Sequence, residues 1–412
     1  MLRISRRAAD RLRSGHLWVY RTDLEGGPEA EQPEPGALVT VTDSRNIPLG
    51  TALYSSASTI AGRIVSRTPE LSRAQYLADL RARIDAAVQL RRTLAPVTGD
   101  TNAHRLIFSE ADGLPGIIAD RYNDLVLLQL LTQGTAQDDV RGVVTQTLRE
   151  AFTADGQALT LWERPDPRIR ELEQLAAPPA GALFSTAEDA PTTTTFALNG
   201  LRFHYDAASG QKTGAFLDQR LNYAAAARAV EASGRVGKAL DVCTYQGGFA
   251  LHLAQVCSQV TGIDASHAAL EAADRNLLLN PKLAERCDTD WIEADAFEYL
   301  RHLDATPEKF DAIVLDPPAF AKSKRAAEGA LRGYKELNLR AIRLLHAGGT
   351  LVTNSCSHHV SLEEFTAIVA SAAADAGRRV QLLETHAAAP DHPEVLTLPE
   401  TRYLKCLICR VD

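Results

Sequence analysis

Two stretches, Val314-Leu315-Asp316-Pro317-Pro318-Ala319-Phe320 and Leu351-Val352-Thr353-Asn354-Ser355-Cys356-Ser357, decide the fold class of this chain. Each begins as a β-branched, apolar run, which predicts a buried strand. Asp-Pro-Pro ends the first run, because proline cannot continue a strand, and the second run ends in a thiol. Ligands of open α/β sheets bind at the carboxyl ends of the strands. The two stretches therefore predict that a carboxylate, an aromatic ring and a cysteine share one site.

From residue 236 onward, predicted strands alternate with predicted helices, which is typical of a parallel sheet with crossover helices. Short apolar runs bounded by turn residues predict the strands. We expect strands over residues 239–243, 260–264, 291–295, 310–316 and 349–356, and a late pair near 379–384 and 403–410. The predicted fold class is therefore α/β, with a Rossmann-like sheet of seven strands.

The length of 412 residues favours two or three domains, because one hydrophobic core rarely organises so long a chain. Residues 1–72 predict a β-rich module, and residues 73–185 predict a small α+β unit that begins with a long amphipathic helix. A linker rich in alanine and proline, 176–181, and a threonine run lie near the start of the third predicted domain, residues 186–412.

The composition is 45% hydrophobic and 23% charged, and no apolar run approaches the length that a membrane helix needs. We therefore expect a soluble protein with no membrane partner. The first twenty residues lack an uninterrupted apolar region, so we expect no secretory signal, a cytoplasmic location and six reduced cysteines. The net charge of -8 argues against indiscriminate binding to nucleic acid.

The local charge at the N-terminus differs from the net charge. Residues 1–21 carry six arginines against the single acid Asp10, with Trp18 and Tyr20 between them. Basic residues interleaved with aromatic ones are typical of a surface that binds RNA. A solvated helix face with the aromatic rings in the core explains the same pattern equally well, so these residues alone leave both interpretations open.

The turn after the first strand of the sheet has the features of a ligand-binding turn. It runs from Asp241 through Tyr245 to the paired glycines Gly247 and Gly248, which allow the backbone to approach a ligand closely. The chain contains no G-x-G-x-x-G or P-loop motif, and therefore no obvious cradle for a pyrophosphate.

Acids also end the next two strands, at Asp264 and at Asp295, which Ala296 follows. Three acids at successive strand ends repel phosphates but suit a nucleoside that carries a cation. S-adenosylmethionine (SAM) is such a nucleoside, and we predict it as the cofactor of these residues. Taken singly, each acid is explained as a helix cap or a loop residue, and the glycines as an ordinary turn. Taken together, they favour the cofactor site.

Cys356 is the predicted nucleophile. Carbon 5 of cytosine is a poor nucleophile, so its methylation requires a thiolate to add first to carbon 6. Asp316 is predicted to hydrogen-bond the amino or N3 edge of the base, and Pro317 and Phe320 to pack on its face. The alternative for Cys356 is that of a small buried hydrophobic residue, the commoner fate of a reduced cysteine.

A basic segment follows Phe320, and we predict that its cations bind substrate phosphates; they are Lys322, Lys324, Arg332 and Lys335. A solvated loop is the alternative. The pair Cys406 and Cys409 has the spacing of a zinc motif, but residues three apart on a strand point to opposite faces, and no second pair completes a set. We therefore expect no metal site, and structural roles for the remaining cysteines.

Seven motifs together resemble those of bacterial 23S rRNA (cytosine-5)-methyltransferases of the RlmI type, and the resemblance extends from end to end of the chain. The motifs are residues 15–19 (Gly-His-Leu-Trp-Val), 110–116 (Glu-Ala-Asp-Gly-Leu-Pro-Gly), 212–220 (Lys-Thr-Gly-Ala-Phe-Leu-Asp-Gln-Arg), 316–318 (Asp-Pro-Pro), 332–335 (Arg-Gly-Tyr-Lys), 355–357 (Ser-Cys-Ser) and 403–405 (Tyr-Leu-Lys).

The resemblance implies a PUA-like RNA-binding module at the N-terminus, a small α+β unit in the middle and a class I SAM-dependent methyltransferase domain after it. It implies that four residues lie beside the cofactor, namely Phe216, Asp218, Gln219 and Arg220. It also implies 23S rRNA as the partner and leaves a homodimer open.

The chain departs from the family pattern at two places. The family often has Asn where this chain has Asp241, and Ser-Tyr-Thr where residues 244–246 are Thr-Tyr-Gln. Relatives that methylate guanine share Asp-Pro-Pro but lack the cysteine, so Cys356 favours cytosine as the target. Two alternatives stay open: methylation of a guanine nitrogen with a structural Cys356, and a non-catalytic RNA-binding assembly factor of the PUA type.

Overall fold

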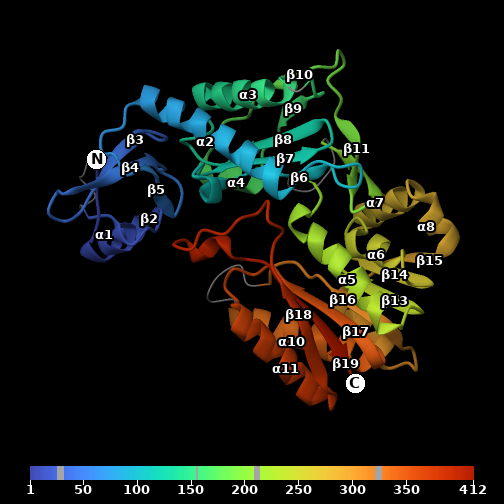
Figure 1. The fold of residues 1–412 in the computed structure, drawn as a ribbon. Helices are drawn as coiled ribbons and strands as arrows, with labels where there is room; N and C mark the ends of the chain where they lie inside the picture. The colour runs from blue at the N-terminus through green and yellow to red at the C-terminus, as the bar shows by residue number, and fades with distance from the viewer. Residues whose placement is uncertain (26–31, 155, 208–213, 321–326) are drawn as a thin grey trace. The chain divides into compact units, whose positions relative to one another are not determined.

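The computed structural model describes residues 1–25, 32–154, 156–207, 214–320 and 327–412. The chain divides into two compact units, which we describe one at a time (Figure 1). Unit 1 comprises Met1–Phe196, Tyr205–Gly214 and Pro390–Thr401, and unit 2 comprises Ala197–His204, Ala215–Ala389 and Arg402–Asp412. No helix among the described residues is long and apolar enough to cross a membrane.

The first sheet of unit 1 has the strand order β1-β3-β4-β5-β2. Its strands are β1 (Leu2–Arg3), β2 (Trp18–Tyr20), β3 (Leu38–Thr42), β4 (Pro48–Tyr54) and β5 (Ile60–Ser66). Helix α1 (Arg6–Arg13) begins at the N-cap Ser5 and buries Ala8, Ala9 and Leu12. A separate apolar core results, in which α1 and the strands bury their apolar side chains together.

The second sheet of unit 1 has the order β10-β9-β8-β7-β6. Its strands are β6 (Ala103–Phe108), β7 (Ile117–Tyr122), β8 (Leu125–Leu130), β9 (Thr160–Glu163) and β10 (Phe184–Ser185), and its helices are α2 (Arg73–Leu94), α3 (Asp138–Thr153) and α4 (Pro167–Glu173). The long helix predicted from residue 72 is confirmed: Ser72 caps α2 in a capping box with Gln75. Helices α2 and α3 share one core with this sheet.

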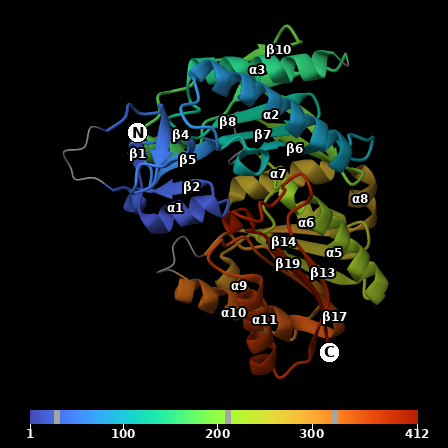
Figure 2. The same ribbon diagram turned by 60° about the vertical axis from the view of Figure 1, so that its left-hand side comes forward.

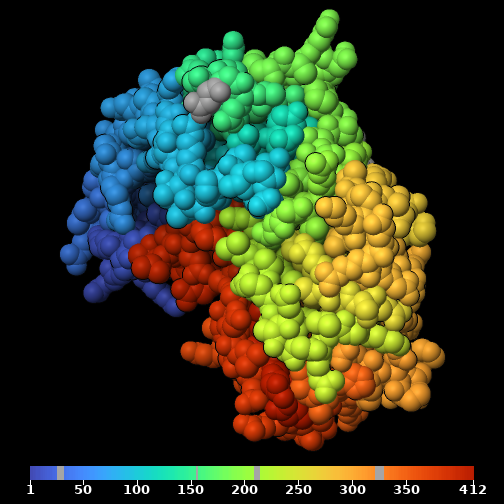
Figure 3. All heavy atoms as spheres, turned by 45° about the vertical axis from the view of Figure 1, so that its right-hand side comes forward, coloured from blue at the N-terminus to red at the C-terminus, as the bar shows by residue number. Residues whose placement is uncertain are grey.

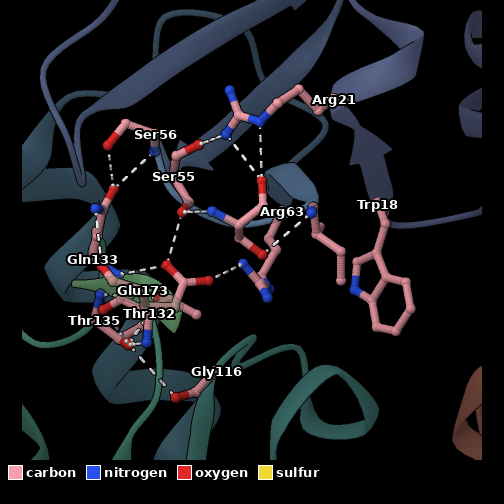
Figure 4. A network of polar contacts seen from close by, with 12 residues as sticks. Trp18, Arg21, Ser55, Ser56, Arg63, Gly116, Thr132, Gln133, Thr135 and Glu173 are labelled. Carbon is pink, nitrogen blue, oxygen red and sulfur yellow. Dashed lines mark hydrogen bonds and ion pairs between the residues drawn. The ribbon is translucent and has the colours of Figure 1, made fainter. Parts of the chain in front are cut away.

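Glu173, at the end of α4, connects the two sheets of unit 1 (Figure 4). Its carboxylate accepts hydrogen bonds from the Ser55 hydroxyl at 2.7 Å and from the backbone amide of Gln133 at 3.4 Å, and it forms an ion pair with Arg63 at 3.5 Å. Glu173 is only 3% exposed. A buried carboxylate is tolerated only with such partners, so this network resists rotation of the first sheet against the second.

Unit 2 contains the predicted seven-stranded sheet, in the order β15-β14-β13-β16-β17-β19-β18, and the predicted fold class is confirmed. The strands are β13 (Lys238–Val242), β14 (Gln259–Asp264), β15 (Asp288–Glu293), β16 (Phe310–Leu315), β17 (Leu345–Ser355), β18 (Val380–His386) and β19 (Lys405–Val411). Strands β13 to β17 are parallel to one another, and β19 is antiparallel to both β17 and β18. A hairpin of β11 (Thr193–Leu198) and β12 (Leu201–Asp206) precedes this sheet in the chain.

Helices cover both faces of the sheet in unit 2 (Figures 1 and 2). One face carries α9 (Ala296–Asp304), α10 (Ala327–Leu344) and α11 (Leu362–Ala376), which share a core with the strands. The other carries α5 (Arg220–Ser233), α6 (Gly248–Leu253) and α7 (His267–Leu278), beside α8 (Pro281–Arg286). The yellow-to-orange atoms of α7 and α8 form one continuous surface in the space-filling view (Figure 3).

Several predicted strand ends are wrong by one or two residues, because each predicted strand includes residues that belong to the turn after it. Strand β13 ends at Val242, β15 at Glu293 and β16 at Leu315. The polar residue that sequence analysis assigned to a strand end lies in the turn beyond it. Asp295 is therefore not a strand residue: it is the N-cap of α9, where its carboxylate accepts hydrogen bonds from two backbone amides.

Candidate active site

The register of the parallel strands brings the polar residues of unit 2 to one edge of the sheet. Val242 of β13 pairs with Ile263 of β14 and with Leu315 of β16, and Leu315 pairs with Thr353 of β17. Asp264 and Asp316 each follow one of these paired residues directly. Because parallel strands present their carboxyl ends at the same edge, the two carboxylates and the residues after Thr353 lie at one level, where α/β folds bind ligands.

Asp241 lies one residue below this edge and is fully buried. Its carboxylate accepts hydrogen bonds from the Thr244 hydroxyl at 2.7 Å and from the Ala250 backbone amide at 2.9 Å. Desolvation, with the charge of Asp264 adding to it, raises the pKa of Asp241 to about 7. Among the described residues, the second carboxylate oxygen, Oδ1, has no hydrogen-bond partner.

The turn after β13 has an unusual backbone. Cys243 and Tyr245 have φ angles of 64° and 51°, and Gly247 has a φ of 85°. Positive φ is strained for residues with a side chain, and such strain is concentrated at functional sites. A Cβ atom added at Gly248 would lie 2.5 Å from Cζ of Tyr223, so only glycine fits there. The predicted glycine pair therefore does shape a tight turn against an aromatic ring.

Asp264 fastens this turn to the neighbouring strand. Its two carboxylate oxygens accept hydrogen bonds from the backbone amides of Tyr245 and Ser266, both at 2.9 Å. Asp295 and Ala296 lie where α9 begins after β15, with the Asp295 carboxylate used as a helix cap. The capping explanation considered for the acids thus accounts for Asp295, whereas Asp264 holds the turn itself.

The segment before α5 contributes four more predicted residues, and three contact the edge described above. The Phe216 and Tyr245 rings lie 5.0 Å apart. The Gln219 amide donates to the Asp316 carboxylate at 3.0 Å, and the Tyr403 hydroxyl donates to the Asp218 carboxylate at 2.6 Å. The fourth residue is Arg220, which begins α5 and is buried.

Asp316 and Cys356 follow the ends of β16 and β17. Desolvation, together with the charges of Asp218 and Asp241, raises the pKa of Asp316 well above its usual range. The Cys356 sulfur lies 3.9 Å from the carbonyl oxygen of Pro317, in the segment that follows Asp316. The predicted thiol thus lies against the backbone of the segment that follows the predicted acid.

The predicted substrate residues have mixed environments. Pro317 is buried, and the Phe320 ring packs against the rings of Phe297 at 5.8 Å and Tyr334 at 4.8 Å. Arg332 is exposed on α10, whereas Lys335 of the same helix forms an ion pair of 2.7 Å with Asp375. The predictions for Lys322 and Lys324 lie outside the described residues.

The arginines near the N-terminus divide into two groups. Arg13 pairs with Asp43 at 2.5 Å, and the Arg21 guanidinium donates to the carbonyl oxygens of Ser55 and Ser58. Arg6 and Arg7, by contrast, are exposed on α1. Only part of the positive charge counted in the sequence is therefore directed to solvent rather than held by internal acids and carbonyls.

Sequence analysis missed three contacts of the site. Tyr403 reaches Asp218, Tyr223 lies under Gly248, and Lys405 donates hydrogen bonds beside Cys356. Tyr403 and Lys405 belong to a motif noted in the sequence, but the motif alone does not say what its side chains touch.

Other polar and cysteine features of the described residues lie apart from this edge or within the core. A cavity of about 440 Å³ in unit 1 is lined by Trp162, Arg164, Asp166 and their neighbours, and by none of the predicted cofactor residues. Cys406 and Cys409 are buried, as expected for core residues. The described part of the chain holds no group of three or more side chains arranged to bind a metal.

Comparison with known proteins agrees with this architecture. The family of PUA-like domains matches residues 2–67, and the family of S-adenosylmethionine-dependent methyltransferases matches residues 116–410. A solved structure from Streptococcus mutans, described as a SAM-dependent methyltransferase, has a TM-score of 0.78 at 18% identity and covers 100% of both chains. A related solved structure, complexed with SAH, has the same TM-score and covers 99% of both chains. The chain is therefore a SAM-dependent methyltransferase by family and by fold, and it carries a PUA-like domain.

Closer relatives specify the family further. Ribosomal RNA large subunit methyltransferase I from Escherichia coli O1:K1 is 37% identical over 402 residues, which cover 96% of this chain and 95% of that protein. The protein of the same name from Escherichia coli O9:H4 (strain HS) is equally similar. The chain belongs to the family of ribosomal RNA large subunit methyltransferase I.

The residues at the sheet edge fit SAM as the cofactor. The Oδ1 of Asp241, which has no partner among the described residues, is a buried polar atom at this edge, and the turn at Gly248 packs too closely against the Tyr223 ring to carry a side chain. The carboxylates of Asp218 and Asp264 give the edge an acidic character, which suits the positive sulfonium. SAM supplies the electrophilic methyl group of the reaction.

Proposed function

We propose that the protein methylates carbon 5 of a cytosine in large-subunit ribosomal RNA, with Cys356 as the nucleophile. The observation that carries the proposal is the placement of Cys356 after β17 beside the Asp316 segment after β16, at the edge where parallel sheets bind ligands. Methylation of a guanine nitrogen needs no thiol at this position. The names of the relatives support ribosomal RNA as the substrate class.

The proposed chemistry assigns one task to each side chain. The Cys356 thiolate adds to carbon 6 of the cytosine, and the electron density that accumulates at carbon 5 attacks the methyl group. Asp316, whose raised pKa favours the neutral acid, donates a hydrogen bond to N3 and stabilises the negative charge that the addition places on the ring. Loss of the carbon 5 proton then expels the thiolate and restores the aromatic base. The methyl group stays on carbon 5, its former bond to the sulfonium having broken, while the thiolate leaves carbon 6 and returns Cys356 to its starting state.

The N-terminal module supports an RNA substrate. Its PUA-like match covers the exposed arginines of α1, which supply a sequence-independent attraction to phosphates. The Glu173 network holds this module against the second sheet of unit 1, so that a bound RNA is presented by a rigid body rather than by a flexible tether. We propose that unit 1 anchors the RNA while unit 2 carries out the chemistry.

The test is nucleoside mass spectrometry of 23S rRNA incubated with methyl-labelled SAM and either the wild-type protein or Cys356→Ala. We expect labelled 5-methylcytidine from the wild type and none from the variant. Cys257→Ala, which removes a buried thiol elsewhere in unit 2, is the matched control and should retain the product. Labelled methylguanosine from both the wild type and Cys356→Ala would refute the cytosine mechanism. A wild-type protein that binds SAM but transfers no methyl group would favour an assembly factor.

The cofactor assignment is tested separately by calorimetry. Asp264→Ala removes the acceptor of two backbone hydrogen bonds in the binding turn and should weaken SAM binding by about tenfold or more. Asp274→Ala, which removes an exposed acid from α7, is the control and should bind SAM as the wild type does. Equal affinity of the two variants would contradict the assignment of Asp264.

A further inference from the structure

Lys405 is a buried cation directly beside the proposed nucleophile. It is 5% exposed and begins β19, where it pairs with Ser355 of β17. Its ammonium group donates to the carbonyl oxygen of Ser357 at 2.7 Å and to that of Tyr403 at 2.8 Å. Ser357 is the residue that follows Cys356, so the backbone of the cysteine turn itself holds the ammonium in place.

The charge of Lys405 is unusual for such a position. Buried lysines normally have a carboxylate partner, because an isolated buried ammonium is costly. Here the two hydrogen bonds go to neutral carbonyls, although an ammonium has three N–H donors. Desolvation lowers the pKa of Lys405 to about 8, against which the charges of Cys356 and Glu364 act to raise it. At neutral pH the ammonium form therefore still dominates.

We infer that Lys405 is a positioning residue that keeps Cys356 in its thiolate form. The inference rests on the proposed nucleophilic role of Cys356. A thiolate, not a thiol, adds to carbon 6, and a neighbouring cation is a common way to favour a thiolate. The interaction is mutual: a thiolate that stabilises the ammonium is stabilised by it to the same extent.

The other titratable groups that the structure describes near Cys356 do not supply this positive charge. From the strand beside it comes Asp316, which is acidic, and from the start of α11 comes Glu364, whose carboxylate accepts from the Ser361 amide. From α10 comes Tyr334, whose hydroxyl shares a hydrogen bond of 2.8 Å with Ser357 and whose raised pKa keeps it neutral. His358 packs its ring against Tyr403 at 5.5 Å. Among the described groups of this cluster, Lys405 is thus the one whose ammonium form supplies positive charge at neutral pH.

The test measures the thiol directly and needs neither SAM nor RNA. The full-length protein is alkylated with iodoacetamide between pH 5 and pH 10, and the rate at Cys356 is read from its peptide by mass spectrometry. For Lys405→Met we expect the midpoint of the pH–rate profile to rise by about one unit or more, and a one-unit rise reduces the thiolate fraction by up to about tenfold at pH values below the midpoint. The rate at neutral pH will fall by less than tenfold, because a thiol of higher pKa is also a stronger nucleophile.

Three further variants separate charge from structure. Lys405→Arg retains the charge and should bring the midpoint of the pH–rate profile most of the way back to its wild-type value. Lys405→Gln retains N–H donors for the two carbonyls but carries no charge, so it should behave as Lys405→Met does. Lys309→Met is the matched control: this half-buried lysine also donates to a backbone carbonyl, that of Arg343 at 2.6 Å, and its loss should leave the midpoint unchanged. SAM affinity, measured by calorimetry, reports whether each variant is folded.

The outcomes for Lys405 and for the proposed function are independent. An unchanged midpoint in folded Lys405→Gln overturns the inference and leaves Lys405 as a structural clamp on the turn, even if methyl transfer falls. A raised midpoint that Lys405→Arg reverses supports it. Formation of 5-methylcytidine by Cys356→Ala overturns the proposed function instead, whatever the alkylation profile shows.

Discussion

Replacing Asp241 by Asn tests the electrostatics of the cofactor site without SAM. Burial raises the pKa of Asp241 from its ordinary value of 3.8 to about 7. The folded state therefore binds the proton more tightly than the unfolded state does, and the contribution of this group to stability is lost as the pH rises from about 4 to about 7. The whole shift corresponds to about 4 kcal/mol of unfolding free energy, of which about 2.5 kcal/mol falls between pH 5 and pH 8.

Asp241→Asn removes this pH dependence but retains an oxygen that accepts from Thr244 and Ala250. The amide nitrogen takes the place of Oδ1, and its cost does not depend on pH. Relative to the wild type, the variant should therefore become more stable by about 2.5 kcal/mol between pH 5 and pH 8. Groups common to both proteins cancel in this difference.

The assay is urea denaturation at four pH values, followed by the fluorescence of Trp291 on β15. Replacing Trp18 and Trp162 by Phe in all proteins confines the signal to unit 2, because these two are the other tryptophans of the chain. Asp274→Asn, an equal change of charge at an exposed position of α7, is the control and should give a flat difference. A flat difference for Asp241→Asn as well would refute the conclusion that burial raises the pKa of this carboxyl to about 7.

Two other predictions concern the stability and shape of single sites. Arg91→Met should destabilise unit 1 by about 3–5 kcal/mol in chemical denaturation, because it leaves the carboxylate of Asp112, 4% exposed, without its buried ion-pair partner. Arg81→Met breaks an exposed pair and should cost less than about 1 kcal/mol; equal losses would contradict the role of burial. Gly248→Ala places a Cβ atom against an aromatic ring and should weaken SAM binding by about tenfold, as calorimetry measures, whereas Gly142→Ala, where no atom lies within 4 Å, should leave binding unchanged.

Sequence patterns predicted the sheet well because strand periodicity and turn residues are local properties. The alternation of strands and helices, the seven strands and the capped helix α2 all follow from short stretches of chain. The predicted strand ends were less accurate, because local sequence does not say whether a polar residue still belongs to a strand or already begins the turn after it. Asp295 illustrates the problem: the turn after β15 is short, so the acid that follows this strand is also the residue that caps helix α9.

The contacts that complete the site depend on distant parts of the chain, and periodicity carries no information about them. The Tyr403 hydroxyl reaches Asp218 across 185 positions, and the Lys405 ammonium reaches Ser357 across 48. The antiparallel entry of β19 beside β17 makes both contacts, and this strand follows the predicted site residues in the chain. A motif at residues 403–405 marked the segment but not its partners.

The buried acids at the sheet edge support the proposed chemistry, because their ionised forms reduce the stability of the fold. Asp241 and Asp316 each have a raised pKa, to which desolvation contributes most and neighbouring acids add, so the fold keeps carboxyl groups where Asn or an apolar residue would be more stable. Natural sequences tolerate such local conflicts mainly at functional sites. In the proposed chemistry, the positive sulfonium would stabilise the ionised form of Asp241, and Lys405 would do the same for the Cys356 thiolate. The proposal thus separates the two kinds of charge along one edge, with acids where the cofactor cation would bind and a cation where the thiolate would form.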